Sequence, residues 1–256
     1  MNTKKIVIPL PSSGFDPTEV AIPWKILTVN NVAVYFTTPE GKMAAADKRM
    51  LTGDGLGIWK KLLRARKDAT DAYYEMEKNE SFKNPIPYAG SEEKQFDALL
   101  LPGGHDKAVR EYLESKTLQQ KVVDFFKAKK PVAAICHGAV LAARSINPEN
   151  NKSVIYDYQT TALLKSQELS AYTMTRLWLY DYYLTYPGNT VEDEVKAALS
   201  NTNQFIKGPF PLFRDGLQHL QRGFFVRDRN YLSARWPGDA YVFSLEFVKM
   251  LRENEK

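Results

Sequence analysis

The stretch "KPVAAICHGAVLAARS", residues 130–145, determines the fold expected for this chain of 256 residues. Its apolar run 131–135 predicts a buried strand, and the residues from Gly138 onward predict a helix. Between them stand Cys136, the only cysteine, and His137, one of three histidines. A residue in a tight strand-to-helix turn projects above the sheet in a strained conformation, as in a nucleophile elbow. We therefore expect Cys136 to be a reactive thiol; a buried structural cysteine is the alternative.

The rest of the chain alternates apolar runs with amphipathic segments. Further strands are predicted in "KKIVIPL" (4–10), "NVAVYFTTP" (31–39), "FDALLLPGG" (96–104) and "QTTALL" (159–164), with a hairpin in "GFFVRDRNYLSA" (223–234). Helices are predicted in "KAVREYLESKTLQQKVVDFFKAKK" (107–130), "SQELSAYTMTRLWLYDYYLTY" (166–186) and "GDAYVFSLEFVKMLRE" (238–253). Strands that read as continuous apolar runs between helices predict an α/β fold with a mostly parallel sheet covered on both faces.

Length and composition suit one domain, residues 1–256, with insertions around 40–94 and 170–220. Hydrophobic residues make up 44% and charged residues 25%, and no apolar run is long enough to span a bilayer. The N-terminus does not read as a signal peptide, and one cysteine cannot form an internal disulfide, so we expect a cytoplasmic protein. The net charge of +5 is scattered among acids, which argues against nucleic acid as a partner. No phosphate-binding glycine loop or zinc-type cluster is found.

Three segments follow predicted strands and should meet at the carboxyl edge of the sheet: 11–19, 102–106 and 136–138. The N–H groups of Gly104 and His137 are candidate donors for an oxyanion hole, although the two glycines of "PGGHD" could equally form a simple tight turn. A thiol at a helix N-terminus beside a histidine should have a lowered pKa, which favours the thiolate.

Three motifs together resemble the DJ-1/PfpI superfamily, which is related to class I glutamine amidotransferases. They are "LLLPGGHD" (99–106), "VAAICHGAVLAA" (132–143) and the closing "RNYLSARWPGDAYVFSLEFV" (229–248). The similarity is closest to the Hsp31-like branch, whose members carry additional covering segments. The resemblance implies a flavodoxin-like three-layer sandwich, a homodimer, and a site that uses neither cofactor nor metal.

The resemblance also implies two carboxylates around the thiol. Glu19 would lie against Cys136, protonated and donating a hydrogen bond; on the residues alone it reads equally well as a first-turn acid of a helix. Glu168 would hold His137 in its useful tautomer. Asp157 is the rival, but it precedes the run 159–164 and should lie at the wrong end of the sheet.

His105 follows the two glycines, where it could face the substrate or cap the next helix. The downstream His219 lacks the nearby glutamate of true amidotransferases, so glutamine hydrolysis is not expected. The resemblance implies instead a cysteine enzyme for small reactive aldehydes, of the glyoxalase III type, that converts methylglyoxal to lactate. A stress-related holdase or cysteine oxidation sensor, and a cysteine peptidase or amidase, are the alternatives.

Overall fold

A single seven-stranded sheet organises the chain in the computed structural model, which describes residues 3–253. Its strand order is β10-β11-β7-β6-β1-β3-β5, and every neighbouring pair is parallel except the hairpin of β10 and β11. The strands are β1 (Lys5–Pro9), β3 (Ala33–Thr38), β5 (Ile86–Pro87), β6 (Ala98–Leu101), β7 (Val132–Ile135), β10 (Phe225–Asp228) and β11 (Tyr231–Ala234). The predicted mostly parallel α/β sheet is therefore confirmed.

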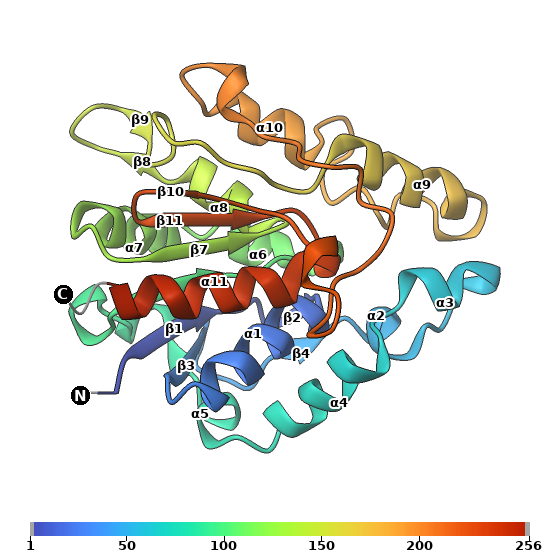
Figure 1. Ribbon diagram of the computed structural model, residues 1–256, viewed down its shortest axis with the longest axis horizontal. Helices are drawn as coiled ribbons and strands as arrows, with labels where there is room; N and C mark the ends of the chain where they lie inside the picture. Colours follow the sequence, from blue (N-terminus) through green and yellow to red (C-terminus); the bar gives the residue numbers. More distant parts are fainter. Residues whose placement is uncertain (1–2, 254–256) are drawn as a thin grey trace.

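Helices cover both faces of this sheet (Figure 1). On one face α1 (Pro17–Val29) packs against α11 (Ala240–Glu253) and α4 (Lys67–Met76). On the other face α8 (Gly138–Arg144) packs against α6 (Arg110–Leu113) and α7 (Lys116–Lys127). The apolar strands β6 and β7 are buried along their whole length because helices lie above and below them.

The remaining segments extend over the carboxyl edge and the flanks. They are β2 (Ser13–Phe15), β4 (Ala45–Ala46), α2 (Lys48–Thr52), α3 (Lys60–Leu63), α5 (Glu80–Lys83), β8 (Ile146–Asn147), β9 (Lys152–Ser153), α9 (Lys165–Leu179) and α10 (Val191–Ala197). Figure 1 shows α9 and α3 projecting beyond the same end of the sheet.

Two sequence-based predictions of secondary structure are wrong. Residues 159–164 form no strand: Thr160 makes a single bridge to Phe205, and the N–H of Thr161 donates to the Ser233 hydroxyl instead of a backbone carbonyl. The helix predicted over 166–186 ends at Leu179, because the backbone of Tyr180 turns to φ +52°.

Close approach of strand ends explains the glycine at the start of α8. A Cβ on Gly138 would lie 2.0 Å from the carbonyl oxygen of Leu101, so α8 can reach β6 only with glycine at this position. A Cβ on Gly103 would lie 2.6 Å from the backbone nitrogen of His137. The carboxyl ends of β6 and β7 therefore lie close together, next to Cys136 and His137. Among residues 3–253, no helix is both long and apolar enough to cross a membrane.

Candidate active site

Cys136 forms the elbow that its position in the sequence predicts. It directly follows β7, and its φ of +57° lies in the left-handed region that a side chain rarely adopts. Such a conformation costs about 1–3 kcal/mol and persists where the surrounding structure enforces it. Here the N–H of Cys136 donates to the carbonyl of Ala234 at 3.1 Å, and the Cys136 carbonyl accepts from Ala139 at 3.2 Å. The sulfur is completely buried.

Glu19 lies against the thiol, as expected. Its Oε2 accepts a 2.9 Å hydrogen bond from the N–H of Gly103, and its carboxyl interacts with Cys136. Burial, followed by the neighbouring charge of Asp16, raises the pKa of Glu19 well above its usual range. A raised pKa favours the protonated form of the carboxyl, and in that form Glu19 can donate a hydrogen bond to the sulfur.

The expected lowering of the thiol pKa is wrong for this structure. Burial raises the pKa of Cys136 well above its usual range, and the carboxyls of Glu19 and Asp16 raise it further. The backbone N–H of His137 lowers the thiol pKa, but it is the smallest of these effects. Desolvation of a fully enclosed sulfur therefore outweighs the helix N-terminus. Nucleophilic attack needs a base that removes the thiol proton.

His137 is placed to be that base. Its Nδ1 lies 3.4 Å from the sulfur, and burial lowers its pKa well below the usual range, so the ring is neutral and can accept a proton. Its Nε2 is buried without a hydrogen-bond partner among the described residues. Because the N–H of His137 also lies beside the sulfur, it remains a candidate oxyanion donor together with Gly104; that pairing stays a prediction.

His105 faces the same centre. Its ring stacks edge-on against His137 at 5.1 Å between centroids and against Tyr183 at 5.0 Å. Burial lowers the pKa of His105 to about 4. The alternative role as a helix cap is wrong, because Asp106 caps the following turn through the N–H of Ala108.

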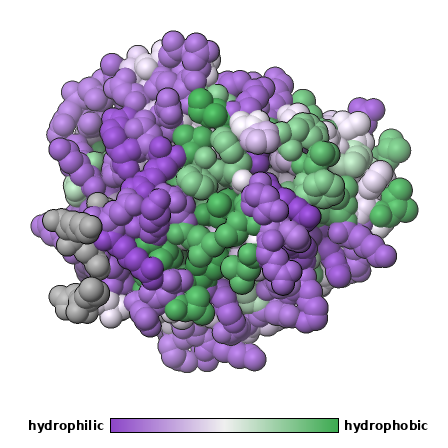
Figure 2. Space-filling model, in the orientation of Figure 1, coloured by the Kyte–Doolittle hydropathy of each residue, from purple (hydrophilic) through white to green (hydrophobic). Residues whose placement is uncertain are grey.

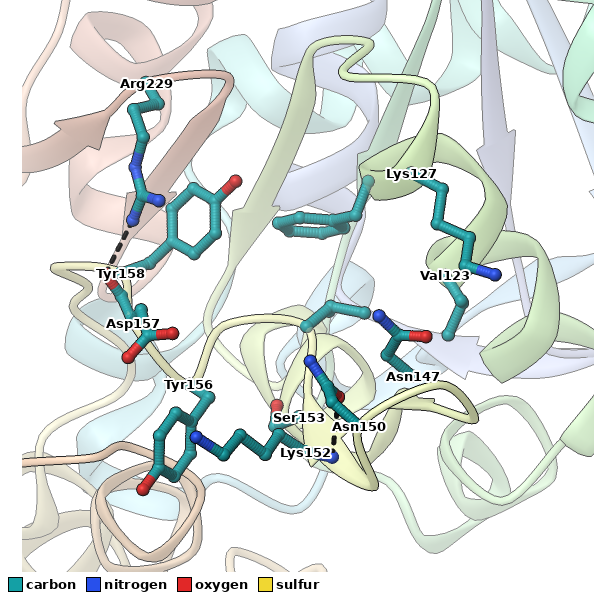
Figure 3. Close-up of a pocket in the computed structure, with 12 residues that line it drawn as sticks. Val123, Lys127, Asn147, Asn150, Lys152, Ser153, Tyr156, Asp157, Tyr158 and Arg229 are labelled. Carbon is teal, nitrogen blue, oxygen red and sulfur yellow. Dashed lines mark hydrogen bonds between the residues drawn. The ribbon is translucent and has the colours of Figure 1, made fainter.

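The two rival acids for orienting His137 both lie elsewhere. Glu168, in the first turn of α9, accepts a 3.0 Å hydrogen bond from the N–H of Val191, and the expected bond to His137 is absent. Burial raises the pKa of Glu168 to about 7. Asp157 lines a pocket beside Arg229 (Figure 3). Arg229 lies two residues before β11, whose start pairs with the start of β7, so this pocket is at the opposite end of the sheet from the elbow. That location confirms the expected position of Asp157.

A cavity of about 350 Å³ lies beside this centre, separated from the buried sulfur by His105, and Cys136, His137 and Glu19 are not part of its lining. His105 and Asp16 form part of its wall, and α9 adds Ser166, Ser170 and Met174, which are spaced four residues apart on one helix face. The sequence analysis missed this lining, although the spacing of small residues in 166–174 is visible in the sequence. It also missed Tyr183, Arg214 and Trp236, which complete the wall. His219 is exposed and outside it.

A metal centre has no obvious donors here, since the part of the chain that the structure describes has no group of three or more His, Cys, Asp or Glu residues arranged to hold an ion. The centre brings together a buried thiol, a neutral imidazole and a carboxyl whose pKa is raised, beside a cavity with a largely apolar lining. This arrangement can perform nucleophilic addition followed by proton transfer.

Two curated proteins are similar in sequence to about two thirds of this chain. An uncharacterised protein of Schizosaccharomyces pombe is 28% identical over 184 residues, which are 68% of this chain and 67% of that protein. Deglycase PfpI of Pyrococcus furiosus is 26% identical over 162 residues, 62% of this chain and 64% of that protein. The chain thus spans about two thirds of the length of these relatives.

Solved structures share the fold over nearly the whole chain. Glyoxalase III of Candida albicans superposes with a TM-score of 0.71 at 15% identity, covering 96% of this chain and 97% of that one. DJ-1beta of Drosophila melanogaster gives a TM-score of 0.57 at 13% identity, covering 98% and 95%. The family model described as ThiJ/PfpI family-like matches residues 10–209. The chain belongs to the ThiJ/PfpI family, within the DJ-1/PfpI superfamily.

Proposed function

We propose that this protein is a cysteine enzyme that converts small 2-oxoaldehydes to 2-hydroxy acids, with methylglyoxal and lactate as the simplest pair. The observation that carries the proposal is the enclosed triplet of Cys136, His137 and Glu19 at the strained elbow. The family membership and the fold shared with a glyoxalase III support it.

The first step forms a bond between the sulfur and the aldehyde carbon. The Cys136 sulfur attacks that carbon, Nδ1 of His137 accepts the thiol proton, and the carbonyl oxygen receives a proton to give a hemithioacetal. Neutral histidine suits this role because its ring nitrogen has a free lone pair. Glu19 keeps a hydrogen bond available to the sulfur while charge changes there.

The second step moves a proton between two carbons of the substrate. His137 takes the proton from the former aldehyde carbon, and a proton returns to the neighbouring carbon, so an enediol becomes a thioester. Water then cleaves the thioester, releasing the 2-hydroxy acid and restoring the thiol. One water is consumed for each turnover, and no electron leaves the substrate. The unpartnered Nε2 of His137 leaves the ring free to exchange protons in this step.

The test measures lactate formed from methylglyoxal in chelator-treated buffer without glutathione. Wild type should produce lactate, and Cys136→Ala should abolish turnover, because the hemithioacetal requires the sulfur. Protection of a heat-denatured client protein is measured on the same samples. Absence of lactate from wild type, with client protection by both proteins, would refute the enzyme and favour the holdase.

A further inference from the structure

Buried polar atoms without partners gather on the wall of the cavity that His105 and Asp16 share with α9. Within residues 3–253, no hydrogen-bond partner is found for Nδ1 of His105, the hydroxyl of Tyr183, Nη1 of Arg214 or the indole nitrogen of Trp236. All four residues line the same cavity of about 350 Å³. Buried polar groups are almost always hydrogen-bonded in folded proteins, so a concentration of exceptions indicates groups that a ligand satisfies.

Arg214 is the strongest of these groups. Its Nη2 donates to the carbonyls of Leu62 and Leu63 at 3.1 and 3.2 Å, whereas Nη1 is fully enclosed and donates to nothing. Among the described residues Arg214 forms no ion pair within 4.0 Å; the charges of Asp16 and Asp68 favour its charged form from farther away, while burial opposes it. A half-buried guanidinium whose carboxylates lie beyond contact distance leaves room for an anion to bind at Nη1.

The residues next to Arg214 provide further hydrogen-bond donors. The indole of Trp236 can only donate a hydrogen bond, and its ring lies under the guanidinium at 5.8 Å from the centroid. The hydroxyl of Tyr183 keeps its proton because burial raises its pKa far above neutral. Arg214, Trp236 and Tyr183 therefore each offer a hydrogen-bond donor, which suits a ligand rich in acceptor atoms.

The rest of the wall limits what that ligand can be. Met50, Leu63, Leu163, Met174 and Phe210 give the cavity a mainly apolar lining. At its mouth Leu62, Phe210 and Leu212 are exposed, and Figure 2 shows hydrophobic surface on the side where α9 and α3 lie. A single cation, with Asp16 on the same wall, suits a monoanion better than a doubly charged phosphate. A carboxylate on a short hydrocarbon chain fits both the donors and the lining.

We propose that Arg214 and Trp236 form a carboxylate-binding subsite, so that the substrate is a 2-oxoaldehyde whose chain ends in a carboxylate. The reaction assigned to this substrate rests on the proposed function, whereas the binding of a carboxylate at Arg214 does not. The reaction is R–CO–CHO plus water giving R–CHOH–COOH, with R carrying the carboxylate held by Arg214. For 4,5-dioxopentanoate the product is 2-hydroxyglutarate.

The binding experiment uses Cys136→Ala protein, which cannot react, and two ligands of similar shape. Calorimetry measures the affinity of 4-oxopentanoate, which carries the carboxylate, and of pentan-2-one, which does not. Arg214→Met should weaken 4-oxopentanoate binding about tenfold to a hundredfold, as expected for a charged hydrogen-bonded pair. Arg222→Met, which removes an exposed arginine from the same region of the chain, is the control and should leave both affinities unchanged.

Turnover provides the second measurement. In the otherwise native enzyme, Arg214→Met should lower the ratio of kcat/KM for 4,5-dioxopentanoate to that for methylglyoxal by a similar factor. Arg214→Lys keeps the charge but loses the planar fork, so its ratio should fall between the two; it also serves as the test if the methionine variant does not fold. An unchanged ratio, or 4-oxopentanoate binding no tighter than pentan-2-one, would overturn the subsite. Carboxylate binding that depends on Arg214 without turnover of either aldehyde would uphold the subsite and refute the proposed reaction.

Discussion

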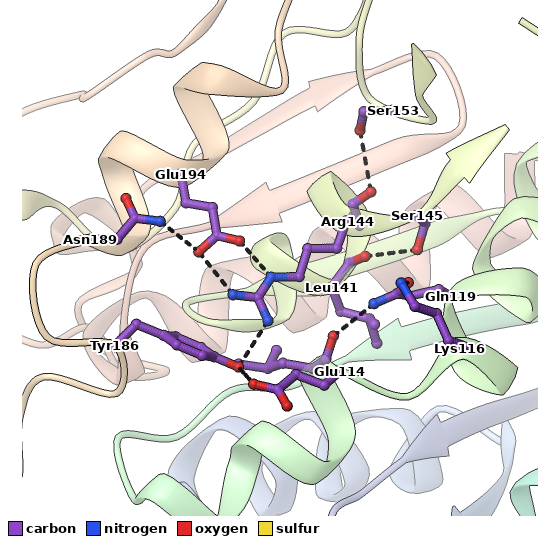
Figure 4. A network of polar contacts seen from close by, with 12 residues as sticks. Glu114, Lys116, Gln119, Leu141, Arg144, Ser145, Ser153, Tyr186, Asn189 and Glu194 are labelled. Atoms are coloured by element: carbon purple, nitrogen blue, oxygen red, sulfur yellow. Dashed lines mark hydrogen bonds and ion pairs between the residues drawn. The ribbon is translucent and has the colours of Figure 1, made fainter. Parts of the chain in front are cut away.

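Arg144 and Arg214 both lie near the site, but their surroundings are opposite. Arg144, at the end of α8, donates to both carboxylate oxygens of Glu194 and, at 2.8 Å, to the hydroxyl of Tyr186, which in turn donates to Glu114 (Figure 4). Arg214 has two backbone carbonyls and an enclosed nitrogen with no partner.

This difference separates a structural region from a functional one. The Arg144 network ties α8, which begins at the elbow, to α10 and to the loop around Tyr186, so its polar atoms are satisfied within the chain. On the wall of the cavity four polar atoms have no partner among the described residues: Nδ1 of His105, the hydroxyl of Tyr183, Nη1 of Arg214 and the indole nitrogen of Trp236. Folded proteins tolerate such unmet groups mainly where binding or catalysis meets them.

Replacing each arginine by methionine should show the contrast most strongly. Arg144→Met leaves Tyr186 without its donor and Glu194 with only the side-chain amide of Asn189, and we expect a loss of about 2–3 kcal/mol in the free energy of unfolding, below the full value for a buried pair because both side chains are partly exposed. Arg214→Met removes an unpaired charge along with two hydrogen bonds, and should change stability by less than about 1 kcal/mol. Urea denaturation of the two variants measures both values. Equal losses would mean that Arg214 is a structural residue.

Glu168 and Glu19 provide a second contrast. Glu168 accepts a structural hydrogen bond from the N–H of Val191, whereas Glu19 lies against the Cys136 thiol. The folded pKa of Glu168, about 7, lies above that of the unfolded chain. The folded state therefore binds the proton more tightly, and the contribution to stability is complete at acid pH and is lost as the pH rises through about 7.

Glu168→Gln keeps an acceptor for the N–H of Val191 and removes the titration. Relative to wild type, we expect the variant to gain about 2 kcal/mol at pH 8.5 and almost nothing at pH 4.5. Denaturation at the two pH values, with the exposed Glu149→Gln as control, measures this difference. A gain independent of pH would contradict it. A large fall in lactate formation would instead show that Glu168 reaches His137 in the reacting enzyme.

The fold was largely predictable because it depends on local patterns. Apolar runs such as 98–101 and 132–135 became strands as their composition and flanking residues predict, and the elbow is encoded by Cys136 and Gly138 directly after a strand. The segment 159–164 failed because its apolar residues are buried without a ladder: the Ser233 side chain takes the hydrogen bond that a neighbouring strand would have taken.

The site was predictable only in part, because several of its properties depend on contacts between residues that are distant in the sequence. Glu19 was placed against the thiol by the family resemblance, and the structure has it there, in the first turn of α1. The partner of Glu168 depends on where α10 begins, and the thiol pKa depends on how completely the sulfur is enclosed. Neither the partner of Glu168 nor the thiol pKa can be predicted from the neighbouring residues in the sequence. The same holds for the unpaired Nη1 of Arg214.

Two neighbouring tyrosines offer the finest test of the contrast. Tyr186 accepts from Arg144 and donates to Glu114, whereas the hydroxyl of Tyr183 is enclosed without a partner. Tyr186→Phe should cost about 1–2 kcal/mol, because two charged groups lose a hydrogen bond each. Tyr183→Phe removes only an unmet hydroxyl and should be neutral or slightly stabilising.

Thermal denaturation of the two phenylalanine variants, in the presence and absence of 4-oxopentanoate, measures this pair. If the cavity wall is a ligand site, Tyr183→Phe should reduce the stabilisation that the carboxylate gives, and Tyr186→Phe should leave that increment intact while lowering the baseline. A loss of baseline stability in Tyr183→Phe as large as in Tyr186→Phe would show that the Tyr183 hydroxyl has a structural partner in solution. The contrast between the Arg144 network and the cavity wall would then be refuted.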